Sequence, residues 1–257
     1  MKHALHAEWT KQRTLASTPW LLLAAAALTI AVSAAAAAAT RCPSGGCAVD
    51  PAKISLTGIY LGQAIVAVLA VLTVSGEYST GMIRLTLAAT PGRVTVLAAK
   101  AAIVAGLTLA AGSIAVLASL LAGGLILPGH GIGPSRGYPS LSFSNESVLR
   151  AGCGSVIYLV LVALLSLGAA AVLREAAAAI GVVLGLLYLF PIIAAAGNAT
   201  VSRHLQQIGP MTAGLAIQAT TGLNSLPISP WAGLGVLAAW ATGALLLGGL
   251  LLHRRDA

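Results

Sequence analysis

The sequence predicts an all-α membrane protein with six transmembrane helices. The 257 residues are 58% hydrophobic and only 8% charged, with a mean hydropathy of +0.94, whereas about a quarter of the residues in a soluble domain are charged. Six stretches of about 20 residues or more lack Asp, Glu, Lys and Arg, which is the length that spans a bilayer core as a helix. These uncharged stretches cover residues 20–39, 54–74, 101–127, 151–173, 176–197 and 231–252. The transmembrane helices built on them are predicted at 19–39, 54–74, 97–127, 151–173, 176–197 and 231–252, within one transmembrane domain of residues 1–257.

Residues 1–18 predict a helix that lies on the membrane surface before the first span. Leu5 and Trp9 share one side of this helix, and Lys2 and Arg13 share another. Glu8 falls within the apolar arc, so the helix could equally pack against a protein partner. The candidate interfacial residues are Glu8, Trp9, Lys11 and Arg13. A signal peptide covering residues 1–40 is the competing interpretation, and its cleavage would leave five spans.

Two cysteines, Cys42 and Cys47, fall in the loop after the first span. Pro43, Gly45 and Gly46 between them favour the tight turn that a short disulfide loop needs. A disulfide is the preferred interpretation, and free thiols or a metal site are the alternatives.

The fourth and fifth uncharged stretches are separated only by Arg174 and Glu175. As one helix they would be about 70 Å long at 1.5 Å per residue, which no bilayer accommodates. The chain is therefore predicted to turn at these two residues.

Residues 205–229 form a segment without any charge that is nevertheless unsuited to a lipid-exposed helix. Gln206, Gln207, Pro210 and Gln218 would leave polar groups unsatisfied in hydrocarbon. We therefore expect a re-entrant or outer-leaflet helical pair that is buried against the bundle.

The distribution of Lys and Arg predicts that both termini are cytoplasmic. With that orientation nine basic residues lie inside and five outside, as the positive-inside rule requires. The inside set is Lys2, Lys11, Arg13, Arg84, Arg93, Lys100, Arg174, Arg254 and Arg255, and the outside set is Arg41, Lys53, Arg136, Arg150 and Arg203. Because these residues flank spans and form no basic domain, membrane topology explains the net charge of +8 better than nucleic-acid binding does.

The cytoplasmic stretch 76–91 predicts a short amphipathic helix between the second and third spans. Helical spacing places Glu77, Gly81 and Arg84 on one strip and Tyr78 and Met82 on the next. Pro91 is expected to end the helix. Spacing alone leaves open whether this element is a solvated connector or a docking element for a cytoplasmic partner. The candidate coupling residues are Glu77, Tyr78, Gly81, Met82, Arg84, Pro91 and Arg93.

The sequence gives no support for several kinds of chemistry. None of the four lysines follows a glycine, so the chain has no phosphate-binding loop for ATP. No histidine has zinc-like spacing to Cys or carboxylates, and no span carries the residues of an intramembrane protease. A charge at mid-span, which proton-coupled transport usually requires, is also missing. We therefore expect no enzyme activity, no cofactor and no metal site in this chain.

Three sequence motifs together resemble the permease subunits of ABC-2 type ABC transporters, especially actinobacterial ones. "GEYSTGMIRLTLAATPGR" at 76–93 is similar to the cytoplasmic segment between the second and third helices of that family. "AEWTKQRTLASTPW" at 7–20 resembles the opening of the family. "SPWAGLGVLAAW", followed by "HRRDA" at the end of the chain, resembles its last helix and tail.

The resemblance implies a half-transporter that forms a homodimer or heterodimer with a second permease copy. A separate cytoplasmic ATPase subunit would bind ATP and Mg, and residues 76–91 and the N-terminal helix would contact it. The second and fifth helices would line the substrate path, which suggests Tyr60, Gln63, Tyr188 and Phe190. Ordinary helix packing is the alternative role of these four residues.

The function implied is export across a bacterial plasma membrane of a hydrophobic or amphipathic substrate: a drug, lipid, peptide or secondary metabolite. A non-transporting scaffold or immunity protein that docks a cytoplasmic partner would use the same six spans. A secondary carrier is a third alternative.

Overall fold

The computed structural model describes residues 2–42, 47, 49–82, 92–134 and 137–254, and this part of the chain contains helices and no strands. The helices are α1 (Lys2–Thr14), α2 (Ser17–Ala39), α3 (Pro51–Ser55), α4 (Ile59–Ser79), α6 (Arg93–Ile126), α7 (Glu146–Leu173), α8 (Ala176–Ala196), α9 (Ala199–Ile208), α10 (Pro210–Gly214) and α11 (Pro230–Arg254), with short 3-10 turns η1 (Leu127–His130), η3 (Leu215–Gln218) and η4 (Leu223–Ser225). Helices α2, α4, α6, α7, α8 and α11 are long and apolar enough to cross a membrane. The protein is thus a multi-pass membrane protein, and the prediction of six such helices is confirmed.

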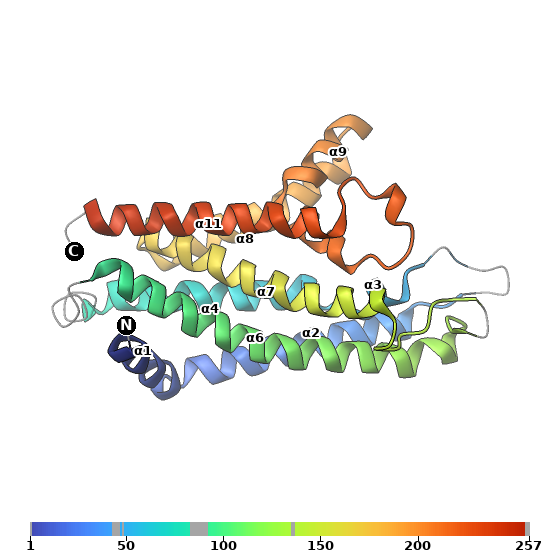
Figure 1. The fold of residues 1–257 in the computed structure, drawn as a ribbon, viewed down its shortest axis with the longest axis horizontal. Coiled ribbons are helices and arrows are strands. Elements are labelled where there is room, and N and C mark those ends of the chain that lie inside the picture. The colour runs from blue at the N-terminus through green and yellow to red at the C-terminus, as the bar shows by residue number, and fades with distance from the viewer. Residues whose placement is uncertain (1, 43–46, 48, 83–91, 135–136, 255–257) are drawn as a thin grey trace.

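The long helices run side by side, and both termini lie at one end of the bundle (Figure 1). Helix α7 packs against α4, α6, α8 and α11 and so lies at the centre. More than half of the span is buried in helices α4 and α7, whereas no more than 28% of it is buried in α2, α6, α8 and α11, which form the outside of the bundle. Apolar side chains on that outside are suited to contact with lipid. We call the end with the termini the terminal end, and the other the loop end.

The turn predicted at Arg174 and Glu175 is present. Arg174 has a left-handed backbone, with φ of 62°, which stops α7. Glu175 then begins α8, because its carboxylate accepts hydrogen bonds from the N–H groups of Ala177 and Ala178 at 3.0 and 2.6 Å. The two helices therefore fold back on each other without a loop.

The second span differs from the prediction of 54–74. Residues up to Ser55 belong to α3, a short helix that Asp50 caps and Pro51 begins, and α4 starts only at Ile59. At its other end α4 continues to Ser79, so residues 76–79 are the last turn of a span and do not begin a separate helix. The expected coupling helix otherwise falls mainly on residues 83–91, which lie outside the described part.

The segment expected to be re-entrant starts earlier than residue 205 and has two unlike parts. Helix α9 has no buried residue and projects from the bundle (Figure 1), whereas α10 and η3 are buried against α7 and α11. Small residues permit this close contact: a Cβ on Gly214 would lie 2.7 Å from the Tyr158 ring, and one on Gly233 would lie 2.0 Å from the Ala213 carbonyl oxygen.

Candidate functional site

A cluster of four charged side chains joins α1, α4 and α6 at the terminal end of the bundle. Lys100 of α6 donates hydrogen bonds to both carboxylate oxygens of Glu8 in α1, at 3.0 and 2.9 Å, and to Glu77 of α4 at 2.5 Å. Lys11 of α1 also pairs with Glu77. Lys100, Glu8 and Glu77 are each no more than 5% exposed. We refer to Glu8, Lys11, Glu77 and Lys100 as the ionic cluster.

The ionic cluster fixes how α1 sits on the bundle. Two carboxylates and two ammonium groups balance in charge, and a buried charge is tolerated only when it is paired. Gln12 adds a neutral contact, since its side-chain oxygen accepts a hydrogen bond from the Thr18 hydroxyl at 2.9 Å. Glu8 thus interrupts the apolar arc of α1 because that side faces charged groups of α4 and α6. Trp9 and Arg13 point elsewhere and are exposed.

The candidate coupling residues are distributed differently from the predicted strips. Glu77 is buried in the ionic cluster, so it does not lie on a docking surface, and Arg174 stacks over the ring of Tyr78 at 5.3 Å. Gly81 and Met82 are exposed, and Gly81 has a left-handed φ of 69° just after α4 ends. Arg84 and Pro91 lie outside the described residues. Arg93 is the first residue of α6.

Lys100 was expected only as a topological signal, and sequence reasoning missed its partners. The position of Lys100 inside the predicted span 97–127 could have indicated an acidic partner, because a charge within a span requires a counter-charge. The sequence could not identify that acid, because its identity depends on how α1 and α4 pack against α6.

A cavity of about 550 Å³ lies at the loop end, between α8, α9, α10 and the beginning of α4. We call it the Tyr60 cavity. Its polar lining residues are Lys53, Tyr60, Ser202, Gln206 and Thr212, and apolar residues such as Pro191, Met211 and Leu215 form the remaining wall. Its volume and mixed lining are those of a small-molecule site.

Three of the four candidate path residues, Tyr60, Gln63 and Tyr188, meet beside this cavity. Gln63 is fully buried. Its amide donates to the Tyr60 carbonyl and to the Met211 sulfur, both at 3.2 Å. Tyr158 donates to the Gln63 side-chain oxygen, and Tyr188 of α8 donates to the Tyr60 carbonyl.

These contacts connect α4, α7 and α8 through one polar network. Of the four candidates only Tyr60 lines the cavity. Phe190 packs at Gly209, between α9 and α10. Tyr158, which was not among the candidates, is part of the network.

A carboxylate holds one side of the Tyr60 cavity in place. Asp50 accepts hydrogen bonds from the Thr220 and Thr221 N–H groups, at 2.5 and 3.1 Å, and from the Thr220 hydroxyl at 2.6 Å. Arg150 donates to the Ala219 carbonyl at 2.7 Å. The chain segment after η3 is therefore tied to α3 and α7, and Ala219 itself lines the cavity.

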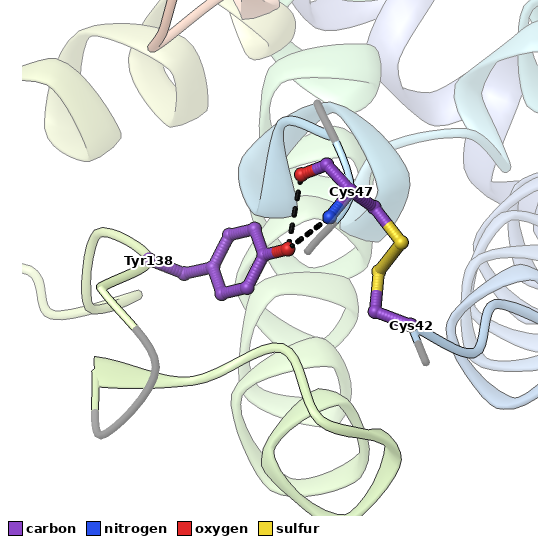
Figure 2. The surroundings of a disulfide bond; sticks show 3 residues. All are labelled: Cys42, Cys47 and Tyr138. Atoms are coloured by element: carbon purple, nitrogen blue, oxygen red, sulfur yellow. Dashed lines mark hydrogen bonds between the residues drawn. A yellow bond between two sulfur atoms is a disulfide. The ribbon is translucent and has the colours of Figure 1, made fainter. Parts of the chain in front are cut away.

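Cys42 and Cys47 form a disulfide at the loop end, with Cα atoms 5.8 Å apart. Figure 2 shows the Tyr138 hydroxyl beside it, which accepts from the Cys47 N–H at 2.8 Å and donates to the Cys47 carbonyl at 2.9 Å. Among the described residues no three His, Cys, Asp or Glu side chains come together as metal ligands.

No protein-family model matches this chain, and no curated protein is significantly similar to it. The resemblance to ABC-2 type permeases therefore rests on the three sequence motifs and stays a prediction.

Proposed function

We propose that this protein is the membrane subunit of an ATP-driven ABC exporter in a bacterial plasma membrane, with cytoplasmic termini. A second permease copy and a cytoplasmic ATPase subunit, which binds ATP and Mg, complete the transporter. One observation supports this most. Helix α4 carries Glu77 of the ionic cluster at one end and Tyr60, beside the cavity, at the other. The two residues are 17 positions apart along the helix, or about 26 Å.

The ionic cluster gives α4 the connection that force transmission requires. Separating its buried charges would cost several kcal/mol, so α1, α4 and α6 are expected to move together at the terminal end. A push by an ATPase on α1, or on the chain around Gly81 and Met82, would then tilt α4.

Tilting α4 would change the contacts of Tyr60 and Gln63 with α8. Alternating access needs two discrete packings that nucleotide binding in the partner favours in turn. The hydrogen bonds from Tyr188 to Tyr60 and from Tyr158 to Gln63 would be present in one packing and broken in the other. The cargo is expected to be hydrophobic or amphipathic, because the spans offer no charged group near their middle.

Co-purification with a matched pair of charge reversals tests the ATPase partner. The tagged chain, solubilised gently from its native membrane, is expected to retain a P-loop ATPase. Arg84→Glu should lose that ATPase, whereas Arg203→Glu, on α9 at the loop end, should retain it. Retention by both variants, with transport intact, would contradict the coupling role. A chain that retains a different cytoplasmic protein and no ATPase would favour the scaffold alternative.

A further inference from the structure

The described lining of the Tyr60 cavity carries positive charge and no negative charge. Lys53 is the only charged residue among the described residues that line it. Lys53 is exposed and forms no ion pair with any described residue. A lysine in this position can lay its apolar stem along the wall and keep its ammonium group at the rim.

The acid closest to Lys53 in sequence does not offset this charge within the cavity. Asp50 directs its carboxylate at backbone groups: Oδ1 accepts from the N–H groups of Ala52 and Lys53, at 3.1 and 3.3 Å, and from the Thr220 hydroxyl. Its other oxygen, Oδ2, accepts from the N–H groups of Thr220 and Thr221. Both oxygens are thus engaged outside the cavity, and neither is left to bind a cationic ligand.

The rest of the lining is neutral and includes both polar and apolar side chains. Ser202, Gln206 and Thr212 supply hydroxyl and amide groups, while Pro191, Met211 and Leu215 form an apolar wall. A ligand that is complementary to the whole lining of the cavity therefore has a negatively charged headgroup, hydrogen-bonding groups and an apolar body.

We infer that the Tyr60 cavity binds an amphiphile with one anionic headgroup, a carboxylate or a phosphate, seated at Lys53, and an apolar body packed against Pro191, Met211 and Leu215. Cationic amphiphiles are rejected because they meet Lys53 and no acidic lining residue. That this amphiphile is the exported cargo rests on the proposed function, whereas its binding does not require the ATPase.

Energy transfer from tryptophan to a dansyl group measures this binding on the whole chain without its partner. Trp240 is a suitable donor, because its indole N–H donates to the Ile208 carbonyl at 3.0 Å, next to the segment that lines the cavity. The probes are dansyl-labelled undecanoic acid and the same dansyl-labelled chain ending in a primary amine. The protein is held in nanodiscs of neutral lipid, and empty nanodiscs give the background.

Two pairs of variants locate the site. Lys53→Gln is expected to raise the Kd of the acid probe about tenfold, the effect of losing one charged hydrogen bond, while Arg203→Gln changes it less than about twofold. Ala195→Phe should obstruct the cavity and abolish saturable transfer. Ala196→Phe, at the neighbouring exposed position that does not line the cavity, should not.

The same experiment distinguishes a bilayer lipid from a free amphiphile. Nanodiscs that contain phosphatidylglycerol should displace the acid probe if an anionic lipid is the ligand, and leave its binding unchanged if it is a free amphiphile. Equal binding of the acid and amine probes, or an equal effect of Lys53→Gln and Arg203→Gln, would overturn the inference. Acid-selective binding in a chain that retains no ATPase would uphold the site and refute only the exporter.

Discussion

Replacing Lys100 with methionine tests whether the ionic cluster holds α1 on the bundle. The substitution keeps the length and apolar stem of the side chain and removes three hydrogen bonds to two carboxylates. Glu8 is then left with Lys11 at 3.8 Å, and Glu77 with Lys11 alone. Two negative charges share one positive charge in a place that water hardly reaches.

The cost follows from this imbalance. Breaking a buried ion pair by removing one partner costs about 3–5 kcal/mol. Because the Lys11 side chain is 24% exposed and can adjust toward both acids, we expect the lower end, about 3 kcal/mol. Adding Glu8→Gln restores neutrality and leaves the pair of Glu77 with Lys11, so the double variant should recover about half of that loss.

The assay is reversible unfolding in mixed micelles with increasing mole fraction of SDS, followed by circular dichroism. Lys53→Met is the matched control, because Lys53 is exposed and forms no ion pair with the described residues. Its free energy of unfolding should stay within about 0.5 kcal/mol of the wild type. The ionic cluster does not hold α1 if the free energy of unfolding of Lys100→Met also stays within about 0.5 kcal/mol of the wild type. The same conclusion follows if the double variant is less stable than Lys100→Met alone.

Three further predictions use the same unfolding assay. Gly58→Ala should lower the free energy of unfolding by about 1–3 kcal/mol, because the added Cβ would lie 1.9 Å from the Thr29 carbonyl oxygen. Gly76→Ala is the control and should be neutral or stabilising, because its Cβ meets nothing within 4 Å. Equal effects of the two substitutions would refute the close contact at Gly58. Asp50→Asn should cost about 1–3 kcal/mol, because one acceptor oxygen becomes a donor that faces N–H groups, and no loss would mean that this tether is not formed. Cys47→Ser should cost roughly 2 kcal/mol, as expected for closing so short a loop; free thiols in protein purified without reductant would contradict the disulfide.

Composition was sufficient to predict the six spans, because an uncharged stretch of about 20 residues has few alternatives to a membrane helix. It did not predict where the spans end. Asp50 and Pro51 start a separate short helix that takes residues 54 and 55 from the second span. Paired charges allow α4 to continue through Glu77 to Ser79, whereas the span was predicted to end at Val74, before this first charged residue.

The site was harder to predict than the spans. The spacing of Glu77 and Gly81 describes one helix viewed alone, and it cannot show that Lys100 and Glu8 cover Glu77 from two other helices. The family resemblance named Tyr60 and Tyr188 as path residues but did not predict that they touch; the hydrogen bond from the Tyr188 hydroxyl to the Tyr60 carbonyl is seen only in the structure. The Tyr60 cavity depends on how residues 199–219 fold back onto the bundle, which no local pattern specifies.

ATP-dependent transport in proteoliposomes is the most direct test of the exporter proposal. The wild-type chain, reconstituted with its co-purified ATPase, should move the dansyl-labelled undecanoic acid across the bilayer only when ATP and Mg are present on the ATPase side. Arg84→Glu should abolish that movement. Movement that continues without ATP, or none while the bound ATPase hydrolyses ATP, would contradict the proposal.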